Sequence, residues 1–107
     1  MRFKFERGAC PKRVARRLQN WLSTAGYEVA YTQCLKLSSR LFWYSDWSDL
    51  RGSIGLSEPS IFDEDVSADI CKLRKASHLA ALTNAGVRDD HAEQIIAEMR
   101  PTARRMT

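Results

Sequence analysis

The clearest hydrophobic pattern in the chain lies between residues 11 and 25, where apolar side chains recur every three or four positions. At about 100° per residue, this spacing places them on one face of a helix. The apolar face consists of Val14, Leu18, Trp21, Leu22 and Ala25. Pro11 suits the first helical position, where the N–H that proline lacks has no partner in any case. Gly26 follows where helices commonly end in a left-handed conformation, so the pattern predicts an amphipathic helix over 11–25.

Residues 2–6 show a different period, because polar and apolar side chains alternate around Phe3 and Phe5. Alternation is the period of a β-strand. A single strand needs a neighbour. We therefore expect this segment to pair either with residues 27–31, which also alternate, or with the same strand of a second subunit.

Two shorter helices are predicted next. Thr32 suits the N-cap of a helix that continues to about residue 43, and Ser45 suits the N-cap of a helix over 46–53 that Gly52 would end. The apolar positions of these two helices are Leu35, Leu37, Leu41, Phe42, Trp47 and Leu50.

Two further helices are predicted in the second half of the chain. Ser67 caps the first, which runs to about Ala85, and Pro101 stops the second, which begins at Asp89 or Asp90. Their expected inward positions are Ile70, Leu73, Leu79, Leu82, Ile95, Ile96 and Met99. Asp90 and Glu93 stand at the spacing of a capping pair.

The fold class predicted by these patterns is mainly α, one small domain of about five helices with a short N-terminal β-strand. A length of 107 residues suits a single domain. Its expected parts are a helical module over 11–54, an acidic loop over 55–66, a helical pair over 67–100 and a basic tail over 101–107.

Composition narrows the class of protein. Hydrophobic residues make up 44% of the chain, which is enough for a real core. The three cysteines are odd in number, which argues against a secreted protein held together by disulfides. Neither a signal peptide nor a membrane-spanning apolar run is apparent. These features predict a protein of the reducing cytoplasm, with no membrane partner.

Charge is unevenly distributed along the sequence. The formal net charge is +4, but residues 1–17 hold seven basic side chains against Glu6 alone. Residues 58–69 hold five acidic side chains and no basic one, and residues 100–105 are basic again. This pattern is typical of nucleic-acid binding, and equally of charge pairing within or between subunits.

Several short motifs within residues 12–54 carry a resemblance to known proteins. They are Ala15-Arg-Arg-Leu18, the Gly26 turn, Gln33 through Leu41, and Tyr44-Ser-Asp-Trp47-Ser-Asp-Leu50. This region resembles a small helical module of bacterial, often plasmid- or phage-associated proteins that are named as glyoxalase superfamily or glyoxalase-related. In that module a glycine usually stands where this chain has Trp43.

The resemblance implies a bacterial or mobile-element origin and no glyoxalase chemistry. A glyoxalase holds its metal with His and Glu or Gln ligands on the strands of paired βαβββ units. The two histidines here, His78 and His91, both lie on predicted helices.

No metal or cofactor is expected from the residues themselves. Cys71 and His78 share a helical face, but no C-x-x-C or H-x-x-x-H element accompanies them. Cys10 lies before the first helix among cations, which would lower the pKa of its thiol. No base is near it in sequence, so we do not expect an enzyme.

The basic face of the first helix is the feature that predicts a function. It would bind the backbone of nucleic acid without reading its sequence. The expected contacts are Arg2, Lys4, Lys12, Arg13, Arg16 and Arg17. The connection after this helix is longer than that of a helix-turn-helix, which argues against a sequence-specific repressor.

A protein-interaction module is the alternative function. It would be a dimeric adaptor or an inhibitor of another macromolecule, and its affinity would come from exposed aromatic side chains or from the acidic loop. The residues expected to carry it are Trp43, Tyr44, Asp63, Glu64 and Asp65.

Overall fold

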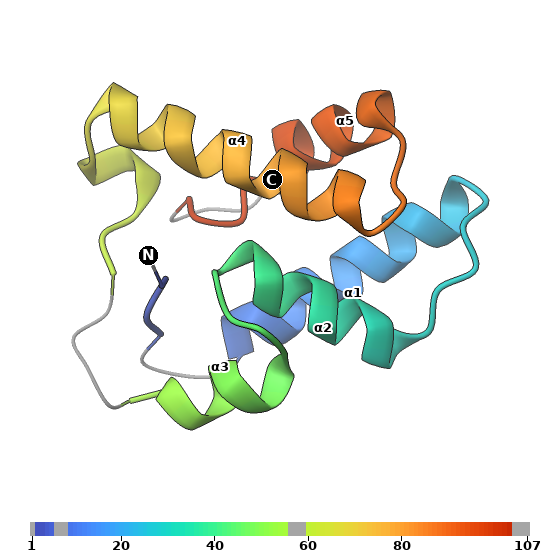
Figure 1. Cartoon of the computed structure of the whole chain (residues 1–107), viewed down its shortest axis with the longest axis horizontal. Coiled ribbons are helices and arrows are strands. Elements are labelled where there is room, and N and C mark those ends of the chain that lie inside the picture. Colours follow the sequence, from blue (N-terminus) through green and yellow to red (C-terminus); the bar gives the residue numbers. More distant parts are fainter. Residues whose placement is uncertain (1, 6–8, 56–59, 104–107) are drawn as a thin grey trace. The chain divides into compact units, whose positions relative to one another are not determined.

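The computed structural model describes residues 2–5, 9–55 and 60–103, which form two compact units, Met1–Ser60 and Ile61–Thr107 (Figure 1). The first unit contains α1, α2 and α3, and the second contains the short 3-10 helix η1 followed by α4 and α5. The expectation of a mainly helical chain with five helices is confirmed for the residues that the structure describes. The boundary between the units falls in the segment that was expected to be a loop.

Helix α1 (Ala9–Thr24) matches the predicted amphipathic helix closely. Its apolar side chains Val14, Leu18 and Leu22 are no more than 1% exposed. The helix begins two residues earlier than predicted, so Pro11 is its third residue rather than its first. Proline is still tolerated there, because the first four N–H groups of a helix have no intrahelical partner.

The predicted N-terminal strand is not found within this chain, since residues 2–5 form no strand in the described part and residue 6 lies outside it. The Phe3 N–H donates to the Phe42 carbonyl at 3.1 Å, and the Phe5 carbonyl accepts from the Gly55 N–H at 3.0 Å. These bonds go to two different segments and build no ladder. The alternating pattern instead lets both phenylalanine rings pack on Phe42. The ring centroid of Phe3 lies 5.8 Å from that of Phe42, and the ring centroid of Phe5 lies 4.7 Å from it.

Helix α2 (Tyr31–Leu41) begins before the predicted cap at Thr32. The N-cap is Ala30, whose backbone N–H donates to Gln33 Oε1 at 2.9 Å. This bond is the half of a capping box that does not need a side chain at the N-cap. The predicted strand partner 27–31 is therefore wrong, because Tyr31 already belongs to the helix.

Trp43 follows α2 in the left-handed region, with φ of 69°. This conformation strains any residue that has a Cβ, and glycine adopts it freely.

We expect Trp43→Gly to be more stable than Trp43→Ala by about 1 kcal/mol, because both variants lose the indole and only alanine keeps the strain. Urea denaturation of the two variants measures the difference. At an ordinary helical position alanine is more stable than glycine by about 0.5–1 kcal/mol. If Trp43→Ala were more stable than Trp43→Gly, the positive φ at this position would not be a source of strain.

Helix α3 (Trp47–Ser53) is capped by Asp46, not by the predicted Ser45. Asp46 Oδ1 accepts from the Asp49 N–H at 2.9 Å. Ser45 instead donates its N–H and its hydroxyl to Asp49 Oδ2, at 3.1 and 3.2 Å. Gly52 lies inside the helix and does not end it.

In the second unit, η1 (Asp63–Asp65) precedes α4 (Ala68–Asn84). The predicted cap at Ser67 is confirmed, since its hydroxyl accepts from the Ile70 N–H at 3.3 Å. The predicted inward face of α4 is largely wrong. Ile70 and Leu73 are 39% and 64% exposed. The buried side chains lie at every fourth position and are Arg74, His78 and Leu82.

Helix α5 (Asp89–Met99) buries Ile95, Ile96 and Met99 as predicted. The expected Asp90–Glu93 capping pair is not formed, because the N-cap is Arg88 and no side chain caps the helix. Arg100 then takes a left-handed conformation with φ of 44° and ends the helix before Pro101.

Candidate functional site

The basic face of α1 consists of Lys12, Arg13, Arg16 and Arg17. The first three side chains are exposed and Arg17 is half-buried. The apolar residues of α1 cause this arrangement, since burying Val14 and Leu18 turns these positions outward. Lys12, Arg13 and Arg16 have no ion pair with any carboxylate that the structure describes.

Lys12 also has an aromatic neighbour, because its Nζ lies 5.9 Å from the ring centroid of Trp47. Trp47 is half-buried at the start of α3. A cation over an aromatic face is attracted by the ring electrons at this distance. The contact places an indole beside one end of the basic face.

Arg2 and Lys4, the other predicted nucleic-acid contacts, lie on the N-terminal segment. Arg2 forms an ion pair with Asp49 at 3.0 Å, and its guanidinium lies 5.0 Å from the Tyr44 ring centroid. The Ser45 N–H bond, together with the charges of Arg2 and Lys4, lowers the pKa of Asp49. Arg2 is thus already neutralised in part, whereas Lys12, Arg13 and Arg16 have no such ion pair among the residues described.

Tyr44 does not form an interaction surface, contrary to expectation. It is 2% exposed, and its hydroxyl donates to the Phe3 carbonyl at 3.1 Å. Tyr44 therefore ties the N-terminal segment to the rest of the first unit. Trp43, the neighbouring candidate, is half-buried.

The acidic segment contains a carboxylate that is already used inside its own unit. Asp63 Oδ1 accepts from Arg74 Nη1 at 2.9 Å and from the Thr102 hydroxyl at 2.8 Å. The Asp63 N–H also donates to the Thr102 carbonyl at 3.0 Å. Asp63 is thus a structural residue of the second unit, whereas Glu64 and Asp65 beside it are exposed.

The thiol of Cys10 is less acidic than the sequence indicated. Burial raises the pKa of Cys10, and the charge of Arg13 lowers it by a smaller amount. The expected activation by nearby cations is therefore wrong, because desolvation of the thiolate outweighs their attraction. Burial also raises the pKa of Cys34.

Among the residues described, no three His, Cys, Asp or Glu side chains are grouped so as to hold a metal ion. The helices of the described segments are also too short or too polar to cross a membrane.

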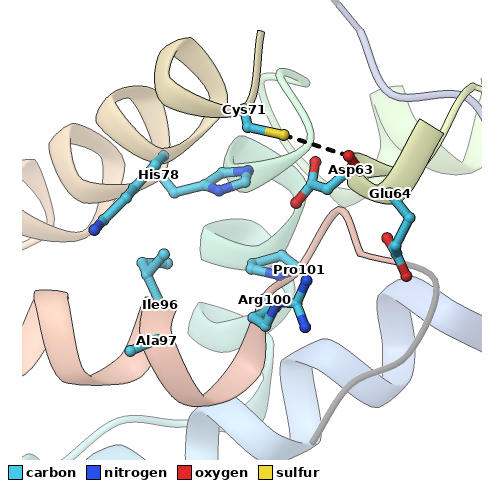
Figure 2. Close-up of a pocket in the computed structure, with 9 residues that line it drawn as sticks. Asp63, Glu64, Cys71, His78, Ile96, Ala97, Arg100 and Pro101 are labelled. Atoms are coloured by element: carbon cyan, nitrogen blue, oxygen red, sulfur yellow. Dashed lines mark hydrogen bonds between the residues drawn. The ribbon is translucent and has the colours of Figure 1, made fainter. Parts of the chain in front are cut away.

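The second unit contains a pocket of about 340 Å³, here called the unit-2 pocket. Figure 2 shows His78 projecting into it from α4, and Asp63 and Glu64 bordering it from η1. The Cys71 thiol donates to the Asp63 carbonyl at 3.4 Å. The remaining lining residues are Lys75, Ile96, Ala97, Arg100 and Pro101.

Sequence patterns indicated only one part of this pocket. The seven-residue spacing of Cys71 and His78 places both on one face of α4, and that face lines the pocket. Lys75 lies on the same face, four residues after Cys71. The contribution of Arg100 depends on how α4 and α5 pack together. No motif in the sequence marks Arg100.

No protein-family model, curated protein or solved structure matches this chain.

Proposed function

We propose that this protein binds the phosphate backbone of nucleic acid through the basic face of α1. The observation that carries the proposal is that Lys12, Arg13 and Arg16 are exposed side by side, with no carboxylate partner among the described residues. Such a face neutralises phosphates and releases their counterions.

The distribution of charge between the units supports the same surface. Residues 1–60 contain ten lysines and arginines and five aspartates and glutamates. The other unit, residues 61–107, has seven basic and eight acidic side chains. The excess positive charge thus belongs to the unit that carries α1.

The geometry favours contacts with the backbone over reading of bases. Lys12 and Arg17 are separated by about 7.5 Å along the helix axis, so the four cations span little more than one turn. Contacts of this kind position a protein on nucleic acid but carry no sequence information. We therefore expect binding to be salt-dependent and indifferent to sequence.

Replacing Arg13 and Arg16 by alanine should lower the affinity for a labelled duplex DNA about tenfold or more at 50 mM salt. Each lost phosphate contact reduces the slope of log K against log salt by about 0.9, so the slope should become shallower by about 1.8. Fluorescence anisotropy between 50 and 200 mM salt measures both quantities.

The matched control removes the same charge from the other unit, through Lys72→Ala and Arg88→Ala. Both side chains are exposed and lie outside the basic face. The control variant should keep the slope of the natural protein. If the two double variants lose affinity equally, net charge rather than the basic face of α1 governs binding, and the proposal is wrong.

A protein-interaction module remains the second candidate, and exposed apolar side chains support it. Ile70 and Leu73 lie three residues apart on α4 and are 39% and 64% exposed. Residues at this spacing share a helix face that a protein partner or a second copy of the chain could cover. Failure of the natural protein to bind DNA or RNA at 50 mM salt would favour this alternative.

A further inference from the structure

The unit-2 pocket combines basic, buried polar and apolar side chains around one space (Figure 2). We propose that it is a binding site for a small monoanion, a carboxylate with an apolar body. The inference is independent of nucleic-acid binding, since the lining residues belong to the second unit.

The size of the pocket limits the ligand to a small molecule. Its volume of about 340 Å³ lies at the lower end of the range of small-molecule sites, about 300–1,000 Å³. A peptide or a dinucleotide would not be enclosed. One ring or one branched chain with a single polar head group is the appropriate scale.

The charges around the pocket favour an anion. Asp63 is neutralised by Arg74 at 2.9 Å and also accepts from Thr102. The other charged side chains among the described lining residues are Glu64 and two exposed cations, Lys75 and Arg100. The described lining therefore carries one positive charge more than it has negative charges. A carboxylate would compensate that charge, whereas an amine would add to it.

The C-terminal end of α5 acts in the opposite direction, because its last carbonyls carry about half a negative charge. Ile96 and Ala97 belong to this last turn. The N-terminal part of α4, which contributes Cys71, carries a positive partial charge of similar size. The two helix ends largely offset each other, so the whole charges of Lys75 and Arg100 decide the preference.

The interior of the pocket suits the apolar body of such a ligand. Ile96 is 6% exposed and Pro101 is also buried, so both offer apolar surface away from the rim. His78 is 2% exposed, and its imidazole carries an N–H donor in either protonation state. The pocket therefore joins an apolar wall to polar groups that can orient a carboxylate.

Arg100 provides a separate indication of function. It has a φ of 44°, a conformation that is costly for any residue other than glycine. Glycine is the common residue at this place after a helix. Strained residues of this kind concentrate at ligand sites, where the side chain has a use. Here the strained residue is one of the two exposed cations among the described residues that line the pocket.

Three compounds that share a phenyl body test the charge preference: phenylacetate, its neutral amide phenylacetamide and the cation phenethylamine. Each is titrated into the full chain to about 20 mM, a range suited to ligands this small. Backbone amide shifts in ¹H–¹⁵N spectra report binding. We expect phenylacetate to shift the amides of Ala97 and Arg100, with at least tenfold weaker binding of the other two.

A chemical readout uses Cys71, which lines the pocket, and Cys10, which lies in the other unit. Alkylation of each thiol by iodoacetamide is followed by peptide mass spectrometry. Phenylacetate should slow alkylation of Cys71 severalfold and leave the rate at Cys10 unchanged. Equal slowing at both thiols would count against binding at the pocket.

The variant Arg100→Gly separates binding from folding. It removes the guanidinium and also relieves the left-handed strain, so its melting temperature should not fall. We expect it to bind phenylacetate about tenfold more weakly, as for loss of one charge-assisted hydrogen bond. Unchanged binding in this variant, tighter binding of phenethylamine, or no response to phenylacetate at 20 mM would each overturn the proposal.

Discussion

Replacing Phe42 by alanine should lower the free energy of unfolding of the first unit by about 3–5 kcal/mol. Phe42 is fully buried, and its ring contacts those of Phe3 and Phe5. The Phe5 ring meets it edge-on at a centroid distance of 4.7 Å and an interplanar angle of 87°. Alanine would remove the ring on which both other aromatic side chains pack.

Urea denaturation followed by tryptophan fluorescence measures this change in the first unit. All three tryptophans, Trp21, Trp43 and Trp47, lie in residues 1–60, so the signal does not come from the other unit. Phe42→Leu is the control, and it should cost less than about 1.5 kcal/mol because most of the buried volume is kept. If both variants lower the free energy of unfolding by the same amount, the aromatic ring of Phe42 is not what holds the N-terminal segment in place.

Replacing Asp63 by alanine should destabilise the second unit by about 2–3 kcal/mol. Removing one partner of a buried ion pair typically costs about 3–5 kcal/mol, because the other charge is left without compensation. The cost here is expected to be lower because the Asp63 side chain is 22% exposed, against 9% for Arg74. The hydroxyl of Thr102 loses the same acceptor.

Far-UV circular dichroism is the suitable probe for this variant, since the second unit has no tryptophan. Asp65→Ala is the matched control, because it removes an exposed carboxylate from the same turn. Exposed substitutions of this kind usually change stability by less than about 0.5 kcal/mol. Equal losses in the two variants would show that the Asp63–Arg74 pair has no special role.

The candidate sites differ in how far sequence could indicate them. The basic face of α1 could be predicted from the sequence because it lies within one helix, where spacing alone determines which residues share a face. The unit-2 pocket could not be predicted in this way, since its lining comes from η1, α4 and α5. Helical spacing places Lys75 beside Cys71 and His78 on α4, but nothing local shows that Arg100 borders the same space.

Helix α4 shows why one pattern misled the prediction of the core. Its apolar residues suggested Ile70 and Leu73 as inward positions, yet Arg74 and His78 are buried instead. Burial of Arg74 is tolerated because Asp63, eleven residues earlier, pairs with it. A hydrophobic pattern cannot foresee that a charged side chain will be compensated by a distant partner.

The sequence by itself determined the five helices, the apolar and basic faces of α1, and the Ser67 cap. These depend on interactions within a few residues, which the order of side chains specifies. The tertiary structure alone decided that Phe3 and Phe5 pack on Phe42 instead of forming a strand, and which face of α4 is buried. Such outcomes depend on partners far apart in the chain, and local periodicity does not encode where those partners lie.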